Sequence, residues 1–197
     1  MELYEAIRRR RMVRAYDGRP IEREVLDRVL DAARRSPSAG YSQGLDLLVL
    51  EGPEQTERYW DITFPDRDDR WIHAGLFDAP VLVMVLVDPG AYTARYSERD
   101  KAGTGLHDEG AWPVPYWWVD GGCATENLLL AAVAEGLGAC LFGIFRGEAE
   151  VLRTFGVPEG RRALGVVSLG HPAPDAPGLS STRRRRPLEE VVHRGGW

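Results

Sequence analysis

The sequence has few of the residues that build metal centres or disulfide frameworks. It holds only two cysteines, Cys123 and Cys140, and four scattered histidines in 197 residues. Each cysteine lies inside an apolar segment, and no CxxC or HxxH pair occurs, so we expect free buried thiols and no metal site. The GxSxG, P-loop and HExxH motifs are also missing. Serine hydrolysis, nucleoside triphosphate hydrolysis and zinc proteolysis therefore have no support.

Two other signals are absent, a dinucleotide fingerprint and a long apolar run. The nearest glycine string, Gly103-Thr104-Gly105, does not join a strand pattern to a helix pattern, which argues against a dinucleotide held permanently on a Rossmann unit. The longest apolar run, residues 79–87, is far shorter than the roughly 20 residues of a membrane span. The N-terminus is charged and has no apolar signal region, so we expect a cytoplasmic protein that does not enter membranes.

Composition favours one globular domain that acts on small molecules. A chain of 197 residues with 44% hydrophobic content can bury one sizeable core. The net charge of -5 and the pI near 5.5 argue against nucleic-acid binding, because affinity for the phosphate backbone needs a net basic surface.

Hydrophobic periodicity predicts alternating helices and strands. Residues 79–88 form an uninterrupted, β-branched apolar run, which predicts a central strand covered on both faces. The predicted helices cover residues 22–35, 54–60, 119–137 and 147–155, and the predicted strands cover residues 45–51, 79–88, 139–145 and 163–170.

Periodicity stops between residues 89 and 118, a segment that we call the excursion. It is too long for an ordinary loop in a compact domain, and it is too rich in tyrosine and tryptophan to be typical of disorder. We expect an ordered segment that covers a site like a lid. The alternative, that its rings fill a satellite core or an oligomer interface, stays open.

One charged stretch is unusual in this acidic chain. Residues 8–17, RRRRMVRAYD, which we call the basic segment, hold five arginines. Leu3, Tyr4 and Ile7 precede them at helical spacing, which predicts a short helix that packs on a neighbour and ends in the arginines. Several guanidinium groups at one point would bind an anion such as phosphate. The alternative is a solvated basic face.

A second stretch, Ser36–Gln43 (SPSAGYSQ), follows a predicted helix and leads into a predicted strand; we call it the site loop. In this order and spacing, the basic segment and the site loop resemble the flavin mononucleotide (FMN) site of the nitroreductase family. Met12 stands where a serine is common in that family, Tyr41 where an asparagine is common, and Gly44-Leu45 where Pro-Trp is common. The positions that match are Arg10, Arg11, Arg14, Tyr16, Pro37, Ser38, Ser42 and Gln43.

Two further stretches resemble the same family. The string ENLLLAA followed by GLGACLFGIF resembles a central helix and a strand whose end offers backbone groups to the flavin ring, by position Phe142, Gly143, Ile144 and Phe145. The run Arg183–Arg186 resembles the basic residues that close on the flavin phosphate ahead of a terminal helix. Arg183 and Arg185 fit that spacing best, although a solvated run stays the alternative.

The resemblance implies an α+β, nitroreductase-like three-layer fold, with a mixed central sheet flanked by helices, in an intertwined homodimer. It implies one FMN-binding domain over residues 1–197, with the excursion as a variable lid and residues 171–197 as an extended tail. It implies cofactor-binding roles for Arg10, Arg11, Met12, Arg14, Pro37, Ser38, Ala39, Tyr41, Gln43, Phe142, Gly143, Ile144, Arg183 and Arg185. It implies substrate contacts for Tyr41, Tyr96, Trp112, Tyr116 and Trp117.

The activity that the resemblance implies is oxidoreduction in which the flavin itself carries the hydride. We expect a ping-pong enzyme that takes a hydride from NAD(P)H, a transient donor, and passes it to a planar, electron-poor acceptor such as a nitroaromatic or a quinone. Two alternatives stay open. One is a flavin-dependent desaturase or dehalogenase of a biosynthetic pathway on the same fold, and the other is a flavin-binding protein without enzymatic activity.

Overall fold

The protein folds into one sheet with helices on both faces. The computed structural model describes residues 1–67, 73–174, 178 and 182–197. No helix in these ranges is long and apolar enough to cross a membrane. The helices are α1 (Leu3–Arg9), α2 (Arg23–Arg34), α3 (Pro53–Thr63), α4 (Pro89–Tyr96), α5 (Tyr116–Ala134) and α6 (Glu148–Thr154). The strands are β1 (Leu45–Glu51), β2 (Val81–Val87), β3 (Gly138–Phe142) and β4 (Arg162–Gly170). Short 3-10 turns are η1 (Ala39–Tyr41), η2 (Ala74–Leu76), η3 (Ala102–Thr104), η4 (Glu109–Ala111) and η5 (Leu188–Glu190).

The four strands lie in the order β1-β2-β4-β3, and each neighbouring pair is antiparallel. The prediction of a mixed sheet is therefore wrong for the part of the chain that the structure describes. Its parallel contribution is one isolated bridge between Met12 and Ala139 at the β3 edge. The error has a simple cause, since strand direction depends on how the chain returns between strands, and hydrophobic patterns do not record that.

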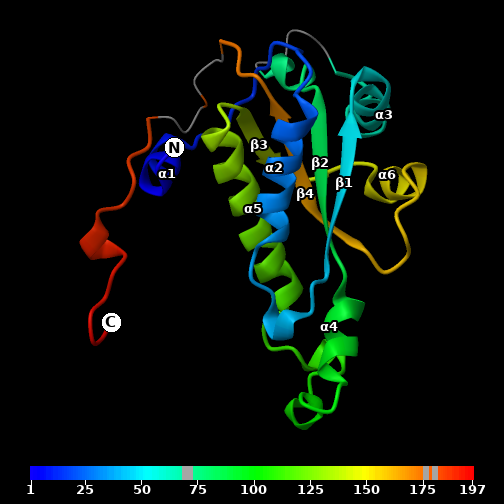
Figure 1. The fold of residues 1–197 in the computed structure, drawn as a ribbon, viewed down its shortest axis with the longest axis vertical. Helices are drawn as coiled ribbons and strands as arrows, with labels where there is room; N and C mark the ends of the chain where they lie inside the picture. Colours follow the sequence, from blue (N-terminus) through cyan, green and yellow to red (C-terminus); the bar gives the residue numbers. More distant parts are fainter. Residues whose placement is uncertain (68–72, 175–177, 179–181) are drawn as a thin grey trace.

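Strand β2 confirms the prediction of a central strand, because all seven of its residues are buried. Its side chains alternate between two cores, as the pleat of a strand requires. Val83 faces α2 and α5 together with Val29 and Leu128, whereas Met84 faces the other core together with Trp60 of α3. Figure 1 shows the resulting layers, with α2 and α5 on one side of the sheet and α3 and α6 on the other.

Element boundaries follow the predictions where the chain carries clear stop signals. Strand β1 covers the predicted residues 45–51, whereas β3 ends at Phe142 and not at Phe145. Helix α5 begins at Tyr116, just after Pro115, and so takes in the last residues of the excursion. The excursion also contains α4, which periodicity did not reveal. The Asp88 side chain caps α4 by accepting a hydrogen bond of 2.9 Å from the Gly90 N–H.

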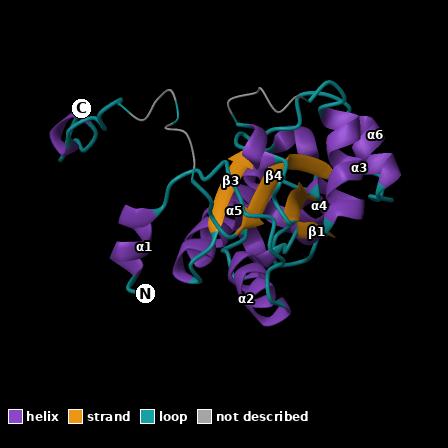
Figure 2. Cartoon of the chain, turned by 90° about the horizontal axis from the view of Figure 1, so that it is seen from above, coloured by secondary structure: helices purple, strands orange, loops and turns teal. Residues whose placement is uncertain are grey.

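The two ends of the chain leave the body of the molecule on the same side, as both views show (Figures 1 and 2). In α1 only Ala6 is buried, while Leu3 and Tyr4 are 61% and 74% exposed. The prediction that this apolar face packs on a neighbour is thus not met inside one chain. The described part of the tail beyond residue 182 is exposed too, and its only regular element is the turn η5 where a terminal helix was expected.

Candidate functional site

The basic segment lies along the free edge of β3. Its backbone forms the parallel bridge from Met12 to Ala139, and the Val13 N–H donates to the Ala139 carbonyl over 2.9 Å. The Met12 sulfur lies 3.5 Å from the Leu141 N–H. A Cβ at Gly138 would come within 2.7 Å of the Val13 side chain, so glycine is what allows this close approach. The sheet edge therefore fixes the path of the chain between the arginines.

Tyr16 fixes the far end of the basic segment. This ring is only 3% exposed, and its hydroxyl donates to the Val13 carbonyl at 2.8 Å and lies 2.8 Å from Ser168 Oγ in β4. The next backbone group, the Asp17 N–H, donates to the His171 carbonyl over 3.1 Å. Both ends of the segment are thus tied to the sheet. The aromatic position that the resemblance singled out is a core anchor.

The arginines of the basic segment differ in their surroundings. Arg10 forms an ion pair of 3.1 Å with Glu126 of α5 and is 22% exposed. Arg11 is exposed. A Cβ added at Gly178 would lie 3.6 Å from Arg14 Nη1, so the tail passes close to this guanidinium. Arg183 and Arg185 are exposed on the tail. The basic segment and Gly178 of the tail therefore lie close together at Arg14.

The end of β3 lies beside the basic segment. Phe142 stacks on Trp60 with ring centroids 5.6 Å apart, and Ile144 packs with Met12 against the same core. Between them, Gly143 has no side chain, and the atoms nearest to a Cβ added there belong to the ring of Phe145, which is 87% exposed. Met12, Phe142, Gly143 and Ile144 are therefore brought together as predicted for one half of a flavin site. Their contact with a cofactor stays a prediction.

The site loop forms a separate, unusually shaped group. Ser38 Oγ accepts a hydrogen bond of 2.9 Å from the Gln43 N–H and so closes the loop on itself. Gly40, Tyr41 and Gln43 all have left-handed backbone, with φ of 61°, 60° and 53°. Bulky side chains rarely adopt this conformation. The Tyr41 ring nevertheless points outward, with 74% of it exposed.

Two residues that the motif comparison did not select support the site loop. Asp120 of α5, which is 8% exposed, accepts hydrogen bonds of 2.7 Å from the Ala39 N–H and from the Tyr92 hydroxyl. Burial, reinforced by this carboxylate, raises the pKa of Tyr92 above its usual range, so the hydroxyl stays a donor. Arg95 Nε donates to the Gly40 carbonyl at 2.9 Å. The one sequence signal was Asp120 itself, an acid near the start of a largely apolar helix.

The aromatic residues of the excursion form a satellite core, which was the alternative to a lid. Trp112 and Trp117 are 7% and 2% exposed and pack with Tyr92. The Trp112 and Tyr96 rings meet edge to face, with centroids 4.7 Å apart. Tyr116 stays 44% exposed. Of the rings predicted to touch substrate, Tyr41 and Tyr116 are accessible and Tyr96 is half-buried, whereas Trp112 and Trp117 are buried.

The two halves of the predicted site contact α5 at different positions along the helix. The site loop contacts α5 in the second turn of that helix, at Asp120, whereas β3 begins just after the helix ends. These points are about 20 Å apart along the helix axis, at 1.5 Å per residue, and Arg10 of the basic segment pairs with Glu126 between them. Figure 1 shows the site loop at the lower end of α5 and the start of β3 at its upper end.

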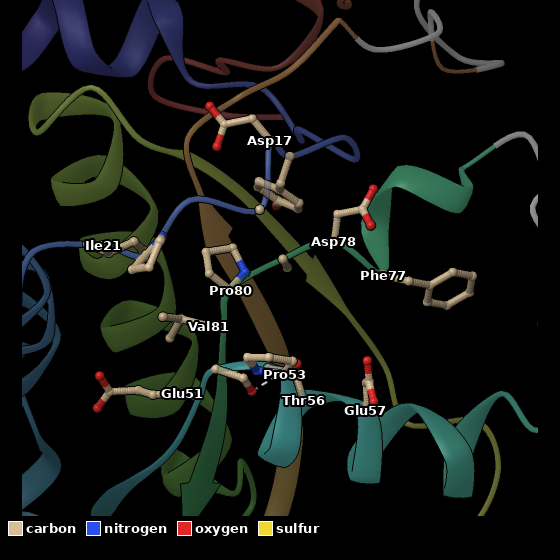
Figure 3. A pocket seen from close by; sticks show the side chains of 15 residues that line it. Asp17, Ile21, Glu51, Pro53, Thr56, Glu57, Phe77, Asp78, Pro80 and Val81 are labelled. Carbon is tan, nitrogen blue, oxygen red and sulfur yellow. Dashed lines mark hydrogen bonds between the residues drawn. The ribbon is translucent and has the colours of Figure 1, made fainter.

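A pocket of about 550 Å³ lies near the end of the basic segment (Figure 3). The acidic residues Asp17, Glu51, Glu57 and Asp78 are among those that line it, beside Pro53 and Pro80. Negative charge at these places disfavours a phosphate dianion. The residues that line it include none of those predicted to bind flavin, so this cavity is not the predicted cofactor site.

Comparisons with known proteins agree with the motifs. Residues 7–171 match the Nitroreductase family. A protein of Methanothermobacter thermautotrophicus is 32% identical over 177 residues, which are 88% of this chain and 78% of that protein. FMN reductase [NAD(P)H] of Bacillus subtilis is 25% identical over 199 residues, covering 98% of this chain and 73% of the reductase. A Desulfovibrio desulfuricans structure in complex with FMN superimposes with a TM-score of 0.72 at 23% identity and covers 100% of this chain and 98% of its own. Because the family match spans most of the chain and agrees with the fold, this protein belongs to the nitroreductase family.

Proposed function

We propose that the protein is an FMN-dependent NAD(P)H oxidoreductase that reduces a planar, electron-poor small molecule in ping-pong fashion. The observation that carries this proposal is the docking of the arginine-rich basic segment on β3, near Gly143, which has no side chain. The family match adds support, as does the similar FMN reductase [NAD(P)H] of Bacillus subtilis. Bound FMN would supply hydride transfer, first from the nicotinamide and then to the acceptor.

The donor groups of the chain fit FMN. Arg10, Arg11 and Arg14 carry the fixed positive charge that a phosphate dianion requires. Arg183 and Arg185 would add to it from the tail. At the other end of the cofactor, Gly143 allows backbone to approach a flat ring closely, because a side chain there would already meet Phe145 at 3.1 Å. Met12 and Ile144 would give that ring an apolar border.

We further propose that two copies of the chain complete each site. The site loop contacts α5 at Asp120, whereas the basic segment contacts it at Glu126 and docks on β3, so a single chain holds the two segments as separate groups. The uncovered apolar residues Leu3 and Tyr4 of α1 favour burial by a second copy. The tail leaves the body on the same side as α1 (Figure 2). In such a homodimer, the basic segment of one chain would face the site loop of its partner.

The acceptor would stack between the exposed rings that border the site loop. Tyr41 and Tyr116 are the accessible aromatic residues among those predicted to touch substrate. Aromatic stacking adds about 0.5–1.5 kcal/mol per pair beyond area burial, which favours planar acceptors. Trp112 and Trp117 would act from beneath by supporting these rings.

The test begins with the absorbance spectrum of the purified protein. We expect a yellow protein that releases FMN, not the adenine dinucleotide form, on acid treatment, and that NADH or NADPH bleaches. A panel of nitroaromatic, quinone and halogenated phenol acceptors then separates the reductase from the dehalogenase alternative. Colourless protein that takes up no added FMN would overturn the proposal, and flavin binding without turnover would favour a binding protein.

A further inference from the structure

The site loop holds a conformation that its own sequence does not favour. Tyr41 and Gln43 are the two residues other than glycine with positive φ, at 60° and 53°, among the described residues. A left-handed backbone at a non-glycine residue costs on the order of 1–3 kcal/mol and persists only where the surroundings impose it. Hydrogen bonds inside the loop, such as the 2.9 Å bond from the Tyr41 N–H to the Ser38 carbonyl, supply part of this restraint, and two residues outside the loop add to it.

Arg95 of α4 supplies the first restraint. Its Nε donates to the Gly40 carbonyl at 2.9 Å, while its two terminal nitrogens each donate to Asp100 at 2.7 Å. This fork leaves the guanidinium no freedom to turn away from the loop, and a lysine could not reproduce it. The Tyr96 ring closes the same corner, because a Cβ on Gly40 would lie 2.7 Å from it.

Asp120 supplies the second restraint from the other side of the loop. It accepts the Ala39 N–H and the Tyr92 hydroxyl, both at 2.7 Å, and therefore ties the loop to α4 and α5 at once. Tyr92 in turn packs edge to face on Trp112 and Trp117, with ring centroids 6.0 Å apart in each case. The aromatic core of the excursion thus packs against Tyr92, which Asp120 contacts, and belongs to the same segment as Arg95.

We propose that Arg95 and Asp120 are positioning residues, and that the excursion is a clamp that holds the Tyr41 ring outward and thereby sets which acceptors the site takes. This inference rests on the proposed function. It assigns the excursion a different task from a lid, since its residues act through the site loop and not by covering the substrate. Tyr41 is the specificity-determining contact.

The test compares three single variants and one double variant. Arg95→Lys removes the fork but keeps the charge, and Tyr41→Asn removes the ring while tolerating the left-handed backbone. Arg99→Lys is the matched control, because Arg99 is exposed on the same segment and shows no ion pair within the described chain. For each variant, and for Arg95→Lys/Tyr41→Asn, we would measure the melting temperature without flavin, and the kcat/KM ratio between a planar bicyclic acceptor and a small monocyclic one.

We expect Arg95→Lys to lower that ratio by about threefold or more, as small misplacements of a positioning group do. Arg99→Lys should leave it unchanged. In the Tyr41→Asn background, Arg95→Lys should have no further effect on the ratio. Tyr41→Asn alone should raise the melting temperature by about 2 °C, because it relieves the backbone strain at residue 41. The same substitution should raise the melting temperature less in the Arg95→Lys background.

The proposal is overturned if Arg95→Lys behaves like Arg99→Lys, or if its effect on the ratio persists after Tyr41→Asn. The melting temperatures test the clamp without any flavin. If Arg95→Lys and Tyr41→Asn have non-additive effects on the melting temperature of a protein that binds no FMN, the clamp is kept and the proposed function is rejected. If the two substitutions have additive effects in an active enzyme that contains FMN, the proposed function is kept and the clamp is rejected. Asp120→Asn is a supplementary variant, and its failure to fold would leave the Arg95 comparison intact.

Discussion

The basic segment and the site loop, the two halves of the candidate site, are held by different kinds of contact. Backbone hydrogen bonds at a sheet edge hold the middle of the basic segment, as in the 2.9 Å bond from Val13 to Ala139, and the Tyr16 side chain anchors its far end. The site loop is held by side chains from other elements, chiefly Asp120 and Arg95. A ladder bond depends little on side-chain identity, whereas a side-chain clamp is lost with one substitution. We therefore expect single substitutions to affect the two halves differently, and to change the conformation of the site loop more easily than that of the basic segment.

The largest effect should come from the aromatic base of the clamp. Trp112→Ala removes a ring that is 7% exposed, and large-to-small changes of this type cost about 3–5 kcal/mol of unfolding free energy. Tyr116→Ala, at a ring that is 44% exposed, should cost much less and should change acceptor preference instead. Denaturant unfolding and acceptor kinetics measure both. Equal stability of the two variants would restore the lid interpretation of the excursion.

The next effect concerns the phosphate-binding charges of the basic segment. Arg10→Ala or Arg14→Ala should weaken FMN binding by about 1.5–3 kcal/mol, the range for hydrogen bonds to charged groups. Arg8→Ala is the control, because it lies outside the matched positions. Flavin fluorescence titration gives the three dissociation constants. Small, equal losses at all three positions would favour a solvated basic face.

The sheet-edge contact itself can be broken through a glycine. Gly138→Ala places a Cβ 2.7 Å from the Val13 side chain and should cost about 1–3 kcal/mol of stability, as overpacking does. FMN affinity should fall with it, because the basic segment would shift. Gly103→Ala in η3, where an added Cβ would meet nothing within 4 Å, should be nearly neutral. If Gly138→Ala lowers stability but leaves FMN affinity unchanged, the contact at the sheet edge does not influence cofactor binding.

Solution pH should have the smallest effect on the clamp. Hydrogen bonds from Arg95 lower the pKa of Asp100 to about 2, so its contribution is present above pH 3.8, its ordinary pKa, and is lost only as the pH falls toward 2. The pKa of Tyr92 is raised by burial, so its contribution is complete below pH 10.0 and declines only above it. Acceptor preference should therefore be flat from about pH 5 to 9, as kcat/KM ratios would show. A change of preference near neutral pH would place another group in control.

The sequence predicted the parts of the fold that local patterns specify. The bounds of β1, the burial of β2 and the positions of both motifs were predicted because stop signals, periodicity and spacing are short-range features. Strand direction was not predicted, and neither was α4, a short helix that begins at Pro89. The restraint of the site loop by Asp120 joins residues 81 positions apart, which no local pattern records. For the same reason, the sequence could not show that Trp112, predicted to line a substrate channel, is buried in a satellite core.

The most direct measurement is subunit complementation, because the central claim is that the two halves of each site come from different chains. One chain would carry Arg14→Ala, and the other Gly40→Val, which places a β-branched residue at φ 61° against Tyr96. Each homodimer should bind little FMN. Differently tagged chains, co-expressed and purified as the mixed dimer, should regain about one FMN per dimer, since one site then has both halves intact. A mixed dimer that binds no more FMN than the two homodimers would contradict the claim.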